Sequence, residues 1–311
     1  MRIAVTTSSF GRHDEAPLAL LRQAGLDVLL NPHGRALTAD EATAMLADCV
    51  GVVAGTEPLS RAVLTALPGL KAISRVGVGL DNIDLACAAE LGIAVRSTPD
   101  GPTRAVAELT VAVILDLLRQ VSGMDRDLRR GVWSKRMGRL LLGRRVGIVG
   151  LGRIGRAVAE LLSALGAEIA YADPQAAAAP WRRLEFPALL AWSEILTLHC
   201  AKQPTPGALL GPAELDLLPS GAWVVNLARG GLIDEAALAE RLAQGRLGGA
   251  ALDVFAREPY SGPLAALDNV VLTPHAASYA LEGRVRMELD AARNLLDALA
   301  QAGVLPAGAG S

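Results

Sequence analysis

Cysteine, histidine and aromatic residues are scarce in this chain of 311 residues. Its three cysteines, Cys49, Cys87 and Cys200, stand far apart without a CxxC pair, which argues against a disulfide framework and against a zinc site. The four histidines form no HxH, HExxH or HxxxH pair, so we expect a mechanism without a metal ion. No apolar run reaches the ~18 residues of a membrane span, and the N-terminus lacks the pattern of a secretory signal. We therefore expect a cytoplasmic protein with no membrane partner.

A strong charge of either sign is also missing. The formal net charge is -2 and the pI is about 6.1, which gives no overall electrostatic case for binding nucleic acid. The composition, 51% hydrophobic and 20% charged, excludes extended disorder. At roughly 150 residues per domain, the length predicts about two globular domains. A small-molecule ligand is the expected partner.

Short apolar runs alternate with helical stretches in two series. This alternation is typical of crossover units and predicts parallel sheets. The first series has apolar runs at 2–6, 28–30, 50–54, 72–74 and 93–95, and the second at 146–149, 168–171, 195–198, 223–227, 250–252 and 270–272. Thr38 and Glu41 have the spacing of a capping box at a helix start. The segment 97–102, with two prolines and a glycine, indicates a boundary between the two series.

Two long helices are predicted beside the second series. One begins at Thr103, where apolar residues recur every three or four positions, and the other covers about 279–300 and is long enough to return to the first series. The predicted fold is α/β with two doubly wound parallel-sheet domains. A Rossmann dinucleotide-binding domain, residues 99–275, is inserted into a flavodoxin-like substrate domain formed by residues 1–98 and 276–311.

A glycine motif between a predicted strand and a predicted helix indicates the cofactor. Gly150, Gly152 and Gly155 follow the apolar run 146–149 and open a helical stretch, and Asp173 ends the next apolar run. This is the dinucleotide-binding fingerprint in its expected context: the glycines allow a tight turn and close approach of the pyrophosphate. Asp173 would accept the ribose 2′-OH and repel a 2′-phosphate. The predicted cofactor is therefore NAD.

Six blocks of the chain resemble the D-isomer-specific 2-hydroxyacid dehydrogenase family, and within it most closely the 3-phosphoglycerate dehydrogenases. The blocks are residues 74–84, 106–110, 150–155, 225–235, 251–259 and 273–275. The resemblance implies reversible hydride transfer between a nicotinamide and a small 2-hydroxy or 2-keto acid, with a substrate similar to 3-phosphoglycerate. A glyoxylate or hydroxypyruvate reductase remains an alternative, as does a dinucleotide-sensing protein similar to the corepressors related to this family. Because the chain stops soon after the last helix, we expect a short form without a regulatory domain.

Arg229, Glu258 and His275 are the catalytic residues that the resemblance implies. Their chemistry suits the reaction, since reduction of a 2-keto acid needs a proton for the carbonyl oxygen and a cation that orients the acid. Arg229 can bridge two oxygens with its planar fork. His275 can donate or accept the proton near neutral pH, and Glu258 would orient the imidazole and favour its charged form.

The resemblance also assigns binding residues around these three. The residues expected to line the cofactor are Arg153, Ile154, His199, Cys200, Leu227, Ala228, Asp253 and Ala277, in addition to the glycines and Asp173. For His199 a structural role is about equally expected. The residues expected at the substrate are Arg75, Val76, Gly77 and Val78, where Gly77 and Gly79 would expose backbone N–H groups to a carboxylate. Arg75 would bind a distal phosphate or second carboxylate, unless it pairs with Asp81.

Three segments bear on the extent of this resemblance. Residues 201–207 differ from the usual pattern of the family, and residues 174–187 are short and rich in alanine. Residues 125–145 are rich in arginine and lysine, which is compatible with a nucleic-acid patch. The preferred interpretation is an arm around Trp133 that packs on a second subunit, as in the family, and gives a homodimer.

Overall fold

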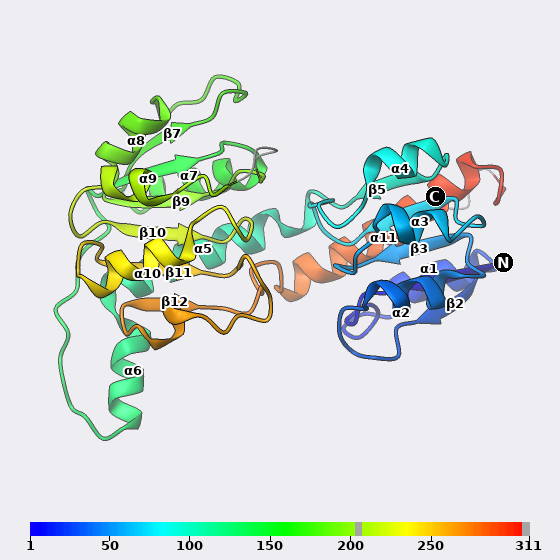
Figure 1. The fold of residues 1–311 in the computed structure, drawn as a ribbon, viewed down its shortest axis with the longest axis horizontal. Coiled ribbons are helices and arrows are strands. Elements are labelled where there is room, and N and C mark those ends of the chain that lie inside the picture. Colours follow the sequence, from blue (N-terminus) through cyan, green and yellow to red (C-terminus); the bar gives the residue numbers. More distant parts are fainter. Residues whose placement is uncertain (203–206, 307–311) are drawn as a thin grey trace. The chain divides into compact units, whose positions relative to one another are not determined.

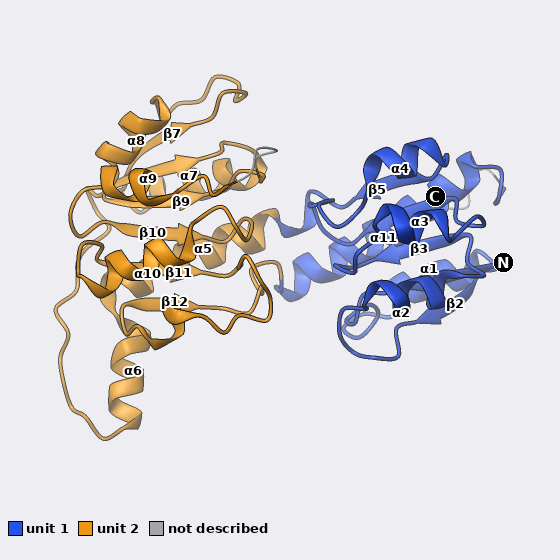
Figure 2. Ribbon diagram, in the orientation of Figure 1, with its two compact units in different colours: residues 1–102, 279–311 blue, residues 103–278 orange. Residues whose placement is uncertain are grey.

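The computed structural model describes residues 1–202 and 207–306 and shows two compact units. Residues 1–102 and 279–311 belong to unit 1, and residues 103–278 belong to unit 2 (Figure 2). Each unit contains one sheet in which the described strands all pair in parallel, with helices packed on the sheet. The predicted fold class, α/β with two parallel-sheet domains, is confirmed.

The sheet of unit 1 has the strand order β2-β1-β3-β4-β5 among the described residues. This is the flavodoxin order, in which the strand order reverses between β1 and β3. The strands are β1 (Arg2–Val5), β2 (Asp27–Leu30), β3 (Gly51–Ala54), β4 (Ala72–Arg75) and β5 (Ala94–Ser97). The helices are α1 (Ala16–Gln23), α2 (Ala39–Leu46), α3 (Arg61–Thr65), α4 (Leu85–Glu90) and the final helix α11 (Leu281–Gln301).

Two apolar cores cover the two faces of this sheet. Val53 belongs to the core that includes α11, whereas its neighbour Val52 belongs to the core that includes α4. This division follows from the strand geometry, because successive side chains point to opposite faces. The capping box predicted at α2 is confirmed: the Thr38 hydroxyl accepts from the Glu41 N–H, and the Glu41 carboxylate accepts from the Thr38 N–H.

In the described part of unit 2, the sheet has the order β12-β11-β10-β9-β6-β7-β8 (Figure 1). When β6 is counted as the first strand, this is the strand order of a Rossmann domain, 3-2-1-4-5-6, with β12 as one further strand at the edge. The strands are β6 (Arg145–Val149), β7 (Glu168–Ala172), β8 (Arg182–Arg183), β9 (Ile195–Leu198), β10 (Trp223–Asn226), β11 (Gly249–Leu252) and β12 (Val270–Leu272). The helices are α6 (Val121–Arg129), α7 (Arg153–Ala164), α8 (Phe186–Trp192), α9 (Pro212–Leu217), α10 (Glu235–Ala243) and the short 3-10 helix η1 (Pro263–Ala266), together with most of α5 (Gly101–Arg119).

The helix predicted to begin at Thr103 begins at Gly101 and ends at Arg119, although the apolar pattern continues to Val121. It includes Pro102, which the first turn of a helix tolerates because no N–H is needed there. Gln120 adopts a left-handed backbone with φ 53°, and α6 begins directly after it. The Asp116 carboxylate accepts a hydrogen bond from the Ser122 N–H at 2.8 Å, which fixes the start of α6.

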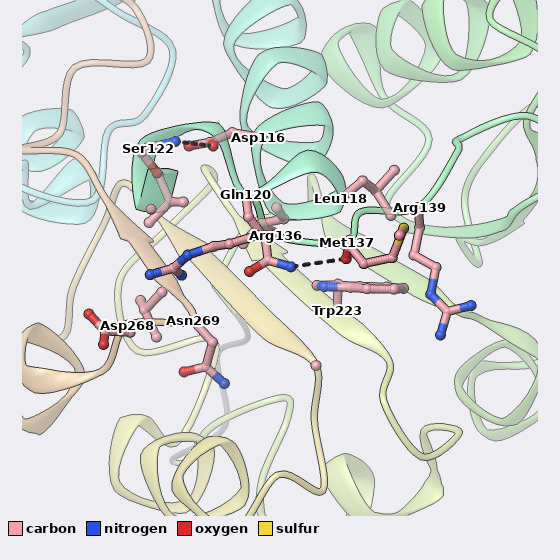
Figure 3. A pocket seen from close by; sticks show the side chains of 15 residues that line it. Asp116, Leu118, Gln120, Ser122, Arg136, Met137, Arg139, Trp223, Asp268 and Asn269 are labelled. Atoms are coloured by element: carbon pink, nitrogen blue, oxygen red, sulfur yellow. Dashed lines mark hydrogen bonds between the residues drawn. The ribbon is translucent and has the colours of Figure 1, made fainter. Parts of the chain in front are cut away.

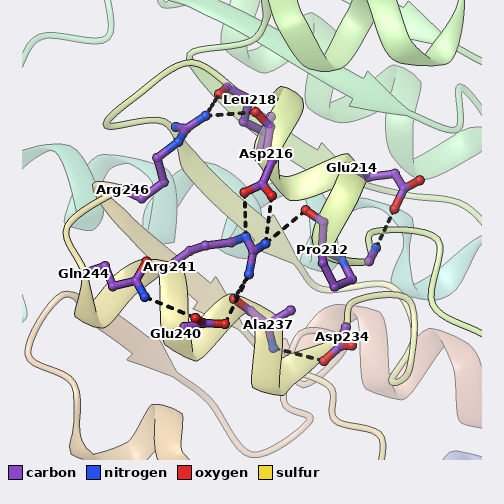
Figure 4. A network of polar contacts seen from close by, with 11 residues as sticks. Pro212, Glu214, Asp216, Leu218, Asp234, Ala237, Glu240, Arg241, Gln244 and Arg246 are labelled. Carbon is purple, nitrogen blue, oxygen red and sulfur yellow. Dashed lines mark hydrogen bonds and ion pairs between the residues drawn. The ribbon is translucent and has the colours of Figure 1, made fainter.

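A network of polar contacts joins α9 to α10 (Figure 4). The Arg241 guanidinium binds the Asp216 carboxylate through two hydrogen bonds of 2.8 and 2.9 Å, and it also donates to the carbonyl of Pro212. Arg246 donates to the carbonyls of Asp216 and Leu218 at the end of α9. Arg246 therefore satisfies carbonyls at the C-terminal end of α9, where a helix leaves such groups without intrahelical partners.

The arm, defined as residues 121–142, comprises α6 and the segment that follows it, and projects from the rest of unit 2 (Figure 1). Its apolar side chains are unusually open to solvent. Trp133 is 84% exposed and Met137 is 92% exposed. No helix among the described residues is both long and apolar enough to cross a membrane.

Candidate functional site

The glycine motif forms a tight turn between β6 and α7. Gly150 has φ 91°, in the left-handed region that favours glycine, and Gly152 is the N-cap of α7. A Cβ atom at Gly155 would lie 2.1 Å from the carbonyl oxygen of Gly150, so only glycine allows the helix to pack this closely on the turn. A Cβ at Gly152 would meet no atom within 4 Å, so the backbone there is open to a ligand. The start of α7 thus presents N–H groups where a pyrophosphate can bind.

Asp173 follows β7 and lies beside this turn. One carboxylate oxygen accepts a hydrogen bond from the Leu151 N–H at 2.7 Å, and the other accepts from the Gln175 N–H at 2.8 Å. The side chain is only partly buried. The carboxylate is therefore fixed in orientation next to the glycine turn, with lone pairs left for a ribose hydroxyl.

His199 follows β9 and packs against the glycine turn. Its Nε2 lies 2.9 Å from the Thr197 hydroxyl, and its Cβ lies within 3.5 Å of the position that a Cβ of Gly155 would occupy. Burial lowers the pKa of His199 to about 3, so its imidazole stays neutral at physiological pH. Burial also raises the pKa of the neighbouring Cys200 thiol. Neither side chain is suited to exchange protons near neutral pH.

His275 and Glu258 form a hydrogen-bonded pair on two neighbouring loops. The Nδ1 atom of His275 lies 2.9 Å from a carboxylate oxygen of Glu258, and both side chains are partly open to solvent, at 49% and 38%. The other oxygen of Glu258 accepts from the Phe255 N–H at 3.1 Å. The peptide bond between Glu258 and Pro259 is cis. Since Nδ1 is engaged, Nε2 is the ring atom that can exchange a proton with a substrate.

Arg229 lies on the loop that follows β10. Asn226, which is only 1% exposed, donates from its side chain to the Arg229 carbonyl at 2.9 Å and accepts from the Ala228 N–H at 3.1 Å. A Cβ at Gly230 would lie 1.8 Å from the carbonyl oxygen of Phe255, so this glycine lets the loop pack against the segment that carries Glu258. The guanidinium donates to the Ala228 carbonyl at 2.8 Å.

These residues lie at one edge of the unit 2 sheet. The glycine turn follows β6, Asp173 follows β7 and His199 follows β9. In the same way, Arg229 follows β10, Asp253 follows β11 and His275 follows β12. The strands are parallel, so their carboxyl ends share an edge, which is where open α/β sheets bind ligands. Among residues 1–202 and 207–306, no group of three or more His, Cys, Asp or Glu side chains could hold a metal ion.

Asp253 and Ala277, both expected at the cofactor, bind each other. The Asp253 side chain is fully buried, and one of its oxygens accepts from the Ala277 N–H at 2.9 Å. The other expected residues of this unit, Arg153, Ile154, Leu227 and Ala228, lie at the start of α7 and directly after β10.

In unit 1, the expected substrate loop follows β4. The Val76 N–H donates to the Ala54 carbonyl at 2.9 Å, and the Gly77 N–H donates to the Thr98 hydroxyl at 2.7 Å. The expectation that the Gly77 N–H is exposed is therefore wrong, because Thr98 at the end of β5 uses it. Within residues 1–202 and 207–306, the N–H groups of Val78 and Gly79 donate no hydrogen bond, so they remain able to bind a carboxylate.

Gly77 and Arg75 lie against each other in this loop. Gly77 has φ 132°, and a Cβ there would lie 1.6 Å from a nitrogen of the Arg75 guanidinium. That guanidinium donates to the Val76 carbonyl. A side chain at position 77 would therefore strain the backbone and displace Arg75.

Two buried residues of unit 1 were missed by the sequence analysis. Thr98 is 1% exposed and fixes Gly77, as described above. Glu57 is also 1% exposed and accepts from the Thr6 hydroxyl at 2.5 Å and from the Gly55 N–H, while burial raises the pKa of its carboxyl. A threonine or glutamate just after an apolar run carries no sequence signal that separates it from a loop residue in solvent.

A cavity of about 240 Å³ lies at the opposite, amino-terminal edge of the unit 2 sheet (Figure 3). Trp223, at the start of β10, forms one wall, and the arm contributes Arg136 and Met137. Asn269, directly before β12, lines another side of the cavity. This cavity is therefore distinct from the site at the carboxyl ends of the strands.

The fold and the site define a protein with a dinucleotide-binding domain that carries a histidine–carboxylate pair and an arginine at one sheet edge. Residues 111–277 match the NAD binding domain of the D-isomer specific 2-hydroxyacid dehydrogenases. The chain belongs to this family, as its sequence resemblance predicted.

Named relatives agree with this assignment, and a solved structure has the same fold. The chain is 40% identical over 269 residues to a glyoxylate reductase of Aeropyrum pernix, which covers 81% of this chain and 79% of the relative. It is 36% identical over 255 residues to a D-3-phosphoglycerate dehydrogenase of Archaeoglobus fulgidus, covering 79% of this chain and 48% of the relative. The chain thus spans about half the length of that dehydrogenase. A crystal structure of a Thermus thermophilus protein superposes with a TM-score of 0.90 at 36% identity and covers 99% of both chains.

Proposed function

We propose that this protein is an NAD-dependent dehydrogenase of small 2-hydroxy acids. The observation that carries the proposal is the His275–Glu258 pair, 2.9 Å apart, at the same sheet edge as Arg229 and the glycine turn. A dinucleotide site, a proton donor and a fixed cation are the groups that reversible reduction of a 2-keto acid requires.

Each residue of the site has a defined task. His275 transfers a proton through Nε2 to the substrate oxygen in reduction and removes it in oxidation. Glu258 orients the ring through Nδ1, which lies 2.9 Å from one of its carboxylate oxygens. Arg229 holds the substrate carboxylate, since its guanidinium stays charged at any working pH.

The cofactor residues fit NAD in their chemistry. The turn from Gly150 to Gly155 and the start of α7 would hold the pyrophosphate, and Asp173 would accept the ribose 2′-OH. The neutral imidazole of His199 would form part of the wall beside the dinucleotide. When bound, NAD supplies the hydride acceptor or donor. We assign cofactor binding to unit 2, residues 103–278, and substrate binding to unit 1, residues 1–102 and 279–311; these bounds differ by a few residues from the domains 99–275 and 1–98 with 276–311 expected from the sequence.

The substrate is proposed to be a 2-hydroxy acid with a second negative group, similar to 3-phosphoglycerate. In unit 1, the N–H groups of Val78 and Gly79 would bind a carboxylate, and Arg75 would bind the distal anion. A glyoxylate or hydroxypyruvate reductase is similarly supported, because relatives with both kinds of name match the chain.

A homodimer is proposed through the arm. Its exposed apolar side chains are Val121, Leu128, Val132, Trp133, Met137, Leu140 and Leu142. So many exposed apolar groups on one projecting segment are unusual on a monomer and mark a protein interface. We also propose a cytoplasmic location, because all three cysteines are free thiols.

The test is a substrate panel followed at the absorbance of NADH. The panel contains the 2-keto acids hydroxypyruvate, its 3-phosphate, glyoxylate and pyruvate, with the 2-hydroxy acids assayed in the reverse direction. We expect turnover of at least one 2-keto acid with NADH, and better use of the phosphorylated member of the pair. Arg75→Ala should lower kcat/KM for the phosphorylated substrate at least tenfold more than for its unphosphorylated analogue. An equal loss of kcat/KM for both substrates would show that Arg75 does not bind a distal anion. It would then favour the alternative of a glyoxylate or hydroxypyruvate reductase.

A further inference from the structure

A buried ion pair lies near the start of α11 in unit 1. Arg284 is 8% exposed and Glu288 is 2% exposed, and the Arg284 Nε atom donates to a Glu288 carboxylate oxygen at 2.9 Å. Charged side chains are rarely buried to this extent, because the loss of water around them is costly. Neither residue has a task in the reaction proposed above, so the pair calls for an explanation of its own.

Glu288 is held in place by the loop that follows β1. The carboxylate oxygen that Arg284 binds also accepts from the Ser9 hydroxyl at 3.1 Å, and the other oxygen accepts from the Gly11 N–H at 2.9 Å. Hydrogen bonds of this kind lock the rotamer of a supporting side chain. Glu288 therefore holds the guanidinium of Arg284 in one orientation.

The rest of the Arg284 guanidinium is available to a ligand. Arginine has five N–H donors in a planar fork, and Glu288 accepts only from the one on Nε. Within residues 1–202 and 207–306, the two terminal nitrogens donate no hydrogen bond, and neither is fully buried. The guanidinium carbon lies 5.1 Å from the centroid of the Tyr279 ring, and this contact fixes its position further. Arg284 thus presents two oriented donor groups without acceptors.

These donors lie at the edge of unit 1 that carries the expected substrate loop. Phe10 follows β1, Val76 follows β4 and Met287 lies one turn after Arg284, and all three belong to the same apolar core. Only β3 separates β1 from β4, and neighbouring strands are about 4.8 Å apart, so the two loops begin roughly 10 Å from each other. The start of α11 and the loop 75–79 therefore border the same part of the sheet edge.

We propose that Arg284 is a second anion-binding arginine of the substrate site, which acts beside Arg75 on the distal anion of the substrate. A planar guanidinium binds phosphate or carboxylate through two parallel hydrogen bonds. Glu288 offsets one positive charge, but Arg75 and Arg12, which is exposed on the loop after β1, add two more at this edge. The net positive charge of these four side chains favours a phosphate monoester, with two negative charges, over a single carboxylate. This proposal rests on the proposed function, in which unit 1 binds the substrate.

The perturbation removes both charges of the pair, Arg284→Gln together with Glu288→Gln. Removal of the arginine alone would leave a buried carboxylate without a countercharge and could unfold the protein. In the double variant, kcat/KM for the 3-phosphate of hydroxypyruvate should fall roughly tenfold more than kcat/KM for hydroxypyruvate, because a charge-assisted contact with the phosphate is lost. The selective loss should appear mainly in KM, since His275 and Glu258 are unchanged.

Binding can also be measured without turnover. Calorimetric titration of 3-phosphoglycerate into the enzyme with saturating NADH forms a complex in which both molecules are reduced, so no hydride is transferred. We expect wild type to bind 3-phosphoglycerate and the double variant to bind it roughly tenfold more weakly. If no 2-keto acid is turned over but this difference in Kd is found, the proposed function fails and the anion site stands.

Two further paired variants complete the test. Arg286→Gln with Asp290→Asn removes an exposed ion pair of the same helix and should leave the kinetic constants and the Kd unchanged. Arg284→Met with Glu288→Leu replaces the buried pair by apolar side chains, which proteins often tolerate without loss of stability, and should show the same selective loss if the glutamine variant does not fold. An equal loss for both substrates would make the pair a purely structural link between α11 and the loop after β1. That result, an unchanged Kd for 3-phosphoglycerate, or no binding of 3-phosphoglycerate to wild type would overturn the proposal.

Discussion

Replacing Glu258 by glutamine tests how the carboxylate acts on His275. The substitution keeps the side-chain shape and can keep a hydrogen bond to Nδ1, but it removes the negative charge 2.9 Å from the ring. The charge-assisted hydrogen bond that orients the imidazole then becomes a weaker, neutral one. The ring is held less firmly where it exchanges a proton with the substrate, so kcat/KM should fall in both directions.

The magnitude follows from the exposure of the pair. Both side chains are partly open to solvent, at 49% and 38%, so water screens their interaction to about 1 kcal/mol. At about 1.4 kcal/mol per tenfold change in rate, kcat/KM should fall by roughly fivefold.

The assay is the measurement of kcat/KM in both directions at saturating cofactor. Glu282→Gln, which removes an exposed carboxylate at the start of α11, is the control and should leave kcat/KM unchanged. A Glu258→Gln enzyme with the wild-type kcat/KM would refute the reasoning and remove Glu258 from the proton transfer.

Three further predictions concern the cofactor, the stability and the assembly. Asp173→Ala should reduce the preference for NADH over NADPH in kcat/KM by roughly tenfold. The substitution removes both the charge-assisted contact of the carboxylate with the ribose 2′-OH of NADH and its repulsion of the 2′-phosphate of NADPH. An unchanged ratio of kcat/KM for the two cofactors would contradict the assignment. The Arg35 guanidinium and the Thr38 N–H lower the pKa of Glu41 to about 2, so the ionised carboxylate stabilises the folded protein. Wild type should lose this stabilisation as the pH falls from about 4.5 towards 2. Glu41→Gln should show a smaller fall in Tm over that range. Trp133→Asp should dissociate the dimer in sedimentation velocity at micromolar concentration, whereas Leu91→Asp, at an exposed site outside the arm, should not; a dimeric Trp133→Asp would exclude the arm as the interface.

Much of the fold follows from local patterns that the sequence displays. The alternation of apolar runs and helices predicts the parallel sheets, and the glycines at 150, 152 and 155 predict the turn before α7. Short helices such as α3, with five residues, span too few positions to show a helical period. The break at Gln120 was also not predictable, because glutamine favours helices and the hydrogen bond that spans the break joins Asp116 to Ser122, on either side of it.

The site shows where sequence information ends. The residues that follow each strand could be named, because parallel strands place their carboxyl ends together. Their partners could not, since a hydrogen bond such as that between Gly77 and Thr98 joins residues from different strands. Asp253 illustrates the same limit: the motif identifies the residue, but only the contacts with Thr273, Ala276 and Ala277 show what its carboxylate binds.

The most direct test of the central claim compares wild type with His275→Ala in the reduction of the best 2-keto acid by NADH. General acid catalysis is worth about 10² to 10⁴ in rate, so kcat should fall by at least a hundredfold. The Kd for NADH should be unchanged, because the glycine turn and Asp173 remain intact. His13→Ala, at an exposed histidine of unit 1, should keep wild-type kcat. A His275→Ala enzyme that retains more than a tenth of the wild-type kcat would contradict the account, because His275 could then not be the proton donor.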